Sequence, residues 1–141
     1  MTKLSTLCLT IGSGLLLGAL TAAAAELDAS KLPPASTKTG LTFANDIKPI
    51  FDKSCVKCHS GEKPKAKLTL DTLEGVLKGG KDNGKTDVVP GHADQSKLLF
   101  AAAHVGDEDD FMPPPKNKAN IGPLTPEQVG IIRAWIDQGA K

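Results

Sequence analysis

The segment Cys55-Val56-Lys57-Cys58-His59 places two thiols three positions apart, with a histidine directly after the second. Side chains at this spacing on a helical turn are neighbours on one face, so both thiols can reach the same edge of a flat ligand. C-x-x-C-H is the attachment pattern of a c-type haem. The motif therefore predicts one covalently bound haem c per chain, with His59 as the proximal iron ligand.

Other chemistries also use cysteines at this spacing. A thioredoxin-like dithiol requires a βαβ context, and no pattern of parallel strands surrounds Cys55 and Cys58. A zinc site would combine these thiols with two of His59, His92 and His104, which lack the usual histidine spacing of roughly three to five residues. Haem attachment is therefore the preferred interpretation, and a metal site, a disulfide or a chance match are the alternatives.

The N-terminal residues have the pattern of a secretory signal peptide. Lys3 gives a short basic start, the stretch from Leu4 to Leu20 is uncharged, and Ala23-Ala24-Ala25 forms a small-residue cleavage site. We therefore expect residues 1–25 to be removed and the mature protein to be periplasmic or otherwise exported, without stable membrane insertion. Because residues 4–25 carry no charge, an uncleaved membrane anchor is the alternative.

The rest of the chain is expected to form one domain behind a leader. Residues 26–42 contain Pro33-Pro34 and several Ser and Thr, which predicts a flexible leader. Residues 43–141 are of single-domain length. The chain has 17 Lys and Arg against 16 Asp and Glu, so no bulk charge indicates a nucleic-acid partner.

Hydrophobic periodicity predicts that this domain is all-α. Asp46 is the expected N-cap of a helix from residue 47 towards the cysteines, and Asp71 that of a short helix ending at Gly79-Gly80. A third helix is expected over about residues 94–104. Thr125-Pro126-Glu127-Gln128 supplies an N-cap, a first-turn proline and a capping-box partner for the last helix. That helix carries an apolar stripe, which we expect to dock on the helix over residues 47–51; the stripe comprises Val129, Ile132, Trp135 and Ile136.

The long loop over residues 105–124 contains Met112, followed by three prolines. Loops of this length are usually functional or disordered, and the prolines favour a stiff, extended backbone. A methionine thioether on the distal side of a haem completes the iron coordination and raises the reduction potential. We therefore predict Met112 as the distal ligand, with His104 and His92 as rivals and an ordinary core methionine as the alternative.

Further motifs accompany the cysteine–histidine segment. Asp46-Ile47-Lys48-Pro49-Ile50-Phe51 precedes it, and Met112-Pro113-Pro114 and Arg133-Ala134-Trp135-Ile136-Asp137-Gln138-Gly139-Ala140 follow. With these motifs, residues 43–141 resemble a class I-type cytochrome c, and more narrowly the planctomycete-type cytochrome c domain. The resemblance implies a small cytochrome c-like fold of three to five helices around one haem. It also implies thioether bonds from Cys55 and Cys58, His59 as proximal and Met112 as distal ligand.

These features together predict a one-electron carrier between redox proteins. No pair of carboxylates, nucleophile–base pair or second metal site is apparent, so we expect electron transfer and no enzymatic activity. A peroxidase-like haem enzyme or a small-gas sensor, each with an open distal position, is the alternative. Six lysines around the motif either form a solvated face or attract an acidic docking surface of a redox partner; they are Lys48, Lys53, Lys57, Lys63, Lys65 and Lys67.

Overall fold

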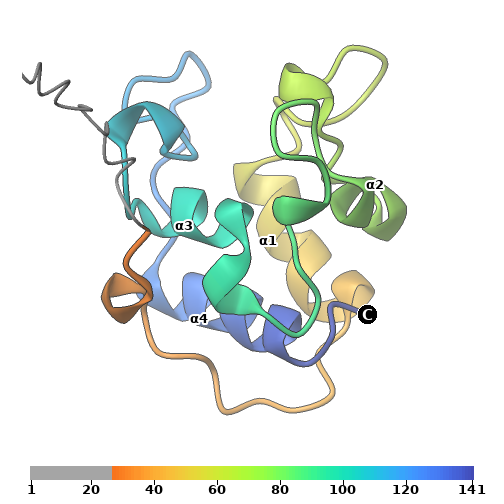
Figure 1. The fold of residues 1–141 in the computed structure, drawn as a ribbon. Helices are drawn as coiled ribbons and strands as arrows, with labels where there is room; N and C mark the ends of the chain where they lie inside the picture. The colour runs from red at the N-terminus through yellow and green to blue at the C-terminus, as the bar shows by residue number, and fades with distance from the viewer. Residues whose placement is uncertain (1–26) are drawn as a thin grey trace, which may run out of the picture.

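The computed structural model describes residues 27–141, so the expected signal peptide over residues 1–25 lies outside the described residues. In this range the chain forms four α-helices joined by short 3-10 or π turns, without a strand (Figure 1). The helices are α1 (Lys48–Ser54), α2 (Leu73–Lys78), α3 (Lys97–Ala103) and α4 (Pro126–Asp137). The prediction of a small all-α fold with three to five helices is confirmed for these residues.

Helix α4 is capped as its sequence predicts. The Thr125 hydroxyl accepts a hydrogen bond from Gln128 N–H at 3.3 Å, and the Gln128 side chain accepts one from Thr125 N–H at 2.9 Å. The predicted apolar stripe of α4 is buried throughout. An isolated helix of this length would be marginal in water, so burial of the stripe provides most of its stability.

The partners of α4 differ from the predicted ones. We expected α4 to dock on the helix over residues 47–51, but it packs mainly on α3 and on the π-helical turn Phe43–Ile47 that leads into α1. The Phe43 ring lies 6.1 Å from the Trp135 ring and 6.2 Å from the Phe51 ring. The centre of the core is therefore aromatic and links the start of the domain to its last helix.

Two predicted N-caps are wrong, because a threonine performs the role in each case. The first helical segment begins at Phe43, so Asp46 is already helical; the Thr42 hydroxyl accepts Asn45 N–H at 3.3 Å, while the Asp46 carboxylate accepts Thr42 N–H. Before α2, the Thr72 hydroxyl accepts Gly75 N–H at 3.1 Å. Each threonine has the extended backbone that an N-cap requires.

The predicted third helix is also interrupted. Residues Ala93–Gln95 form a 3-10 turn, and α3 starts only after Ser96, whose backbone is extended. The Ser96 side chain is fully buried, where it donates to the His92 carbonyl oxygen and accepts Val89 N–H. These two bonds turn the chain sharply and shorten the helix.

Residues 27–42, expected to be a flexible leader, lie along α4 (orange segment in Figure 1). Leu32 and Leu41 are buried in the core, and Arg133 on α4 donates to the Pro33 carbonyl oxygen at 2.7 Å. Prolines make this segment extended, which leaves its carbonyl groups free to bind α4 side chains. The segment before residue 43 is therefore part of the packed unit.

Candidate haem-binding site

The cysteine–histidine motif continues α1 as a hydrogen-bonded turn. Cys55 N–H and Val56 N–H both donate to the Phe51 carbonyl oxygen, at 2.8 and 2.9 Å. Cys58 N–H and His59 N–H both donate to the Cys55 carbonyl oxygen, at 3.1 and 3.0 Å. Both thiols and the imidazole are thus held on one compact turn, although the predicted helix itself ends at Ser54.

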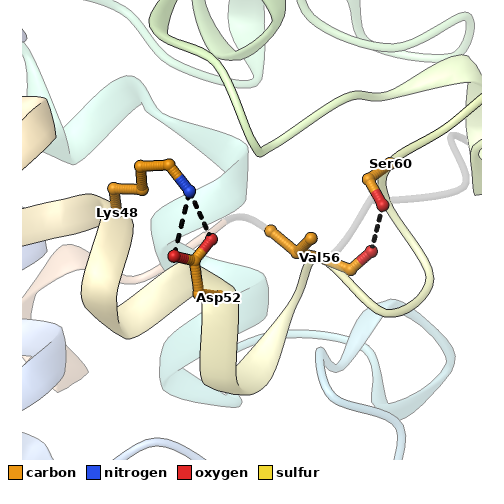
Figure 2. Close-up of polar contacts among 4 residues, drawn as sticks. All are labelled: Lys48, Asp52, Val56 and Ser60. Atoms are coloured by element: carbon orange, nitrogen blue, oxygen red, sulfur yellow. Dashed lines mark hydrogen bonds and ion pairs between the residues drawn. The ribbon is translucent and has the colours of Figure 1, made fainter.

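Side-chain contacts lie within the turn and within the helix before it (Figure 2). The Ser60 hydroxyl donates to the Val56 carbonyl oxygen at 2.7 Å, which closes the turn after the motif. One helical turn before the motif, Lys48 Nζ lies 2.7 and 2.9 Å from the two carboxylate oxygens of Asp52. Sequence reasoning did not identify Ser60, because a serine after the histidine has no motif of its own.

The segment that follows the motif folds back onto it. Lys65 N–H donates to the Cys58 carbonyl oxygen at 2.9 Å, and Leu70 N–H donates to the His59 carbonyl oxygen at 2.8 Å. Leu70 is itself buried in the core. The backbone carbonyl groups before and after the His59 side chain are therefore both hydrogen-bonded to the segment over residues 65–70.

Cys55 and Cys58 are free thiols of intermediate exposure. Burial, with a smaller contribution from Cys58, raises the pKa of the Cys55 thiol to about 12. Cys55 also lies at the C-terminal end of α1, where the helix dipole disfavours an anion. A reactive dithiol of the thioredoxin class needs the opposite, a lowered pKa that yields a thiolate at neutral pH. The site therefore does not support the dithiol alternative.

His59 is 9% exposed, and its Nδ1 is buried without a hydrogen-bond partner. Burial is the main cause that lowers the pKa of this imidazole, so the ring is neutral at neutral pH. Neutral imidazole is the form that binds metals. A buried polar atom without a partner needs an explanation, and a metal ion would provide one only if it bound Nδ1 itself.

Asp87 is a buried acid near this site that sequence reasoning missed. It is 5% exposed, and its carboxylate accepts Gly80 N–H at 2.8 Å and the Asn83 side-chain amide at 2.9 Å. Its charge acts on the pKa of His59 in the raising direction, but burial of the ring outweighs it. The sequence did predict that a helix ends at Gly79-Gly80, shortly before Asp87, whereas burial of the carboxylate depends on packing.

Met112 lies on the loop between α3 and α4, and its side chain is 37% exposed. Its backbone N–H donates to the Ala101 carbonyl oxygen at 3.0 Å, which attaches the loop to the last turn of α3. In Figure 1 this light-blue loop and the green segment after α1 both extend away from α4. The Met112 thioether is therefore not part of the core, and the alternative of an ordinary core methionine is wrong. The exposed thioether is accessible to a ligand.

The two rival histidines have different surroundings. His104 Nε2–H donates to the Pro113 carbonyl oxygen at 3.1 Å, and its ring stacks on Phe111 with centroids 4.6 Å apart. His92 is exposed in the turn before α3. The structure thus brings His104 to the segment that carries Met112, whereas His92 lies on another turn.

Two features are absent from residues 27–141. No group of three or more His, Cys, Asp or Glu side chains in this range is arranged to hold a metal ion, so the zinc alternative finds no support there. Within the same range no helix has the length and apolar character needed to span a bilayer.

The residues present fit a covalently attached haem. They offer two free thiols at the required spacing, a neutral imidazole with a partnerless nitrogen and an exposed thioether. A family model described as Planctomycete cytochrome C matches residues 55–116, a range that includes all four of these side chains. Searches of curated proteins and of solved structures found no match to the chain. The match supports a planctomycete-type cytochrome c domain over residues 55–116.

Proposed function

We propose that this protein is an exported c-type cytochrome with one haem, which carries single electrons between redox proteins. The observation that supports this most is the turn at Cys55–His59, which presents two free thiols and a buried, neutral imidazole with a partnerless nitrogen. The turn begins the range that matches the cytochrome family. We propose no enzymatic reaction.

In this proposal Cys55 and Cys58 form thioether bonds, His59 is the proximal ligand and Met112 the distal one. A bound haem c supplies an iron that accepts and releases one electron. The protein would hold the proximal iron ligand in place, because the carbonyl oxygens of Cys58 and His59 are hydrogen-bonded to the segment over residues 65–70. An anchored ligand moves little between oxidation states, which suits rapid electron transfer.

The location and the partners form a second part of the proposal. The signal peptide over residues 1–25 directs export to the periplasm or an equivalent compartment, and the mature protein does not insert stably into a membrane or bind nucleic acid. We propose a redox partner with an acidic docking surface. Exposed lysines around the motif support this proposal, whereas Lys48 is paired with Asp52; the exposed set is Lys53, Lys57, Lys63, Lys65 and Lys67.

Covalent attachment is tested by producing the full chain in a host that exports proteins and attaches haem. We expect a coloured protein whose pigment stays with the polypeptide in acidified organic solvent. A Cys55→Ser/Cys58→Ser protein should lose the pigment under the same conditions. A colourless wild-type protein, or pigment released into the solvent, would contradict the proposal.

The distal ligand separates the carrier from the haem-enzyme and gas-sensor alternatives. With Met112 bound, the ferric protein should show the weak red band of thioether-to-iron coordination, and Met112→Ala should abolish it. Leu27→Ala is a matched control, since Leu27 is the other large hydrophobic side chain exposed within residues 27–141. A five-coordinate wild-type spectrum that responds to peroxide or carbon monoxide would instead support an open distal position.

A further inference from the structure

We infer that His104 is a positioning residue, which holds the loop carrying Met112 in the conformation that presents the thioether to the haem iron. The inference rests on the proposed function, because it takes Met112 as the distal ligand. It assigns His104 a role other than that of a rival ligand. From the sequence, the only feature expected to fix the conformation of this loop was the stiffness of its prolines.

His104 occupies the C-cap of α3 in a left-handed conformation, with φ 55° and ψ 45°. Residues other than glycine rarely adopt this conformation, and it persists only where surrounding contacts favour it. Here it ends α3 and directs the imidazole to the following loop. In this conformation the ring makes two contacts with the loop, one with Phe111 and one with Pro113.

The ring binds the residues on both sides of Met112. It stacks on the Phe111 ring with an interplanar angle of 11° and centroids 4.6 Å apart. Its Nε2–H donates to the Pro113 carbonyl oxygen at 3.1 Å. Because a carbonyl oxygen only accepts, this bond places the proton on Nε2. That nitrogen is therefore committed to the loop.

Backbone bonds complete the attachment. Met112 N–H donates to the Ala101 carbonyl oxygen, so the tripeptide 111–113 is held to the end of α3 at three consecutive residues. Beyond it, the Asn117 side-chain amide donates to the carbonyl oxygens of Pro114 and Ile121 at 2.9 and 2.8 Å. Phe111 is half-buried and Pro113 buried, whereas the Met112 side chain between them is exposed. The loop is thus fixed while its thioether stays accessible.

The test measures how easily an added ligand displaces Met112 from ferric iron, with imidazole as the probe. An added ligand binds only the fraction of molecules from which the methionine has dissociated, so weaker holding gives tighter imidazole binding. His104→Phe retains a ring to stack on Phe111 but lacks the donor. We expect it to bind imidazole about fivefold more tightly than wild type, the effect of one ordinary hydrogen bond.

Further variants and a second measurement make the test specific. His104→Gly tolerates the left-handed backbone but loses both contacts, so its imidazole affinity should rise above that of His104→Phe. His92→Phe, at an exposed histidine on another turn, should match wild type. Hydrogen exchange of the Met112 amide, which is bonded to Ala101, should accelerate in His104→Phe and not in His92→Phe.

The outcomes separate the role of His104 from the proposal that Met112 is the distal ligand. Unchanged imidazole affinity in His104→Phe and His104→Gly, with the thioether band dependent on Met112, would overturn the role of His104 alone. If Met112→Ala retained the wild-type spectrum and imidazole affinity, the distal assignment would fail and the inference with it. If His104→Gly does not fold, His104→Phe and its amide exchange still decide the question.

Discussion

The backbone N–H of Ser36 donates a 2.9 Å hydrogen bond to the carbonyl oxygen of Gly130, within α4. The two residues are joined here although most of the domain separates them in the chain. A Cβ added at Gly130 would lie 2.6 Å from the carbonyl oxygen of Pro34. Glycine is therefore required at this point of α4, because residues 34–36 pass too close for any side chain.

Gly130→Ala should destabilise the protein. Alanine in a helix interior is normally about 1 kcal/mol more favourable than glycine. Here the added methyl group meets a backbone carbonyl that cannot move independently, so we expect a net loss of about 1–3 kcal/mol in the free energy of unfolding. Urea denaturation measures the change. Gly122→Ala is the control, since an added Cβ there meets nothing within 4 Å. A stabilised Gly130→Ala protein would contradict the packing of residues 34–36 on α4.

Thr72→Ala should cost about 1 kcal/mol of stability, because it removes the hydroxyl that accepts Gly75 N–H at the start of α2. Thr72→Ser retains an acceptor and should restore most of the loss. Asp71→Ala tests the cap that the sequence had suggested and should have little effect. Thermal unfolding of the three variants distinguishes the caps, and a larger loss for Asp71→Ala would reinstate the sequence-based prediction.

Asp87→Ala should destabilise the protein by about 1–3 kcal/mol, since it leaves the part-buried donors at Gly80 and Asn83 without an acceptor. Asp82→Ala is the matched control. Asp82 is exposed and lies 3.8 Å from Lys81 Nζ in a surface ion pair, so its loss should change stability by no more than about 0.5 kcal/mol. Equal effects of the two substitutions in urea denaturation would show that the Asp87 carboxylate is not buried.

Cys55 should resist alkylation in chain produced without haem attachment. An unperturbed cysteine has a pKa of about 8.5, so about half of it is thiolate at that pH. Burial raises the pKa of Cys55 to about 12, which leaves the thiol protonated at pH 8.5. Alkylation by iodoacetamide should therefore be slow in the native chain and fast in urea, as followed by mass spectrometry of the Cys55 peptide. The native rate should rise as the pH approaches 12, and equal native and unfolded rates at pH 8.5 would contradict burial.

The lysines around the motif should steer charged reagents to the haem. In Lys57→Glu/Lys63→Glu we expect slower reaction with an anionic oxidant such as hexacyanoferrate(III) and faster reaction with a cationic one, at low salt. High salt should remove both effects by screening. Lys31→Glu/Lys38→Glu changes the net charge equally at exposed lysines of the leader and should have less effect. Rates that depend only on net charge would reject local steering.

Local patterns in the chain were enough to predict α4 and the turn that holds Cys55, Cys58 and His59 together. The capping box uses residues three apart, and the apolar stripe repeats with the helical period, so neighbouring residues determine both. The cysteine–histidine motif is equally local, because the spacing of the two thiols and the adjacent imidazole is set within five residues. Contacts between residues far apart in the chain have little influence on whether these two features form.

Distant contacts decided the rest. The leader is ordered on α4 because Arg133 and Gly130 meet residues 33–36, which lie far away in the chain. Burial of Asp87 and the attachment of the Met112 loop to His104 likewise depend on how separate segments pack. Composition made the leader look flexible, since a sequence shows which groups can bond but not which partners packing brings within reach.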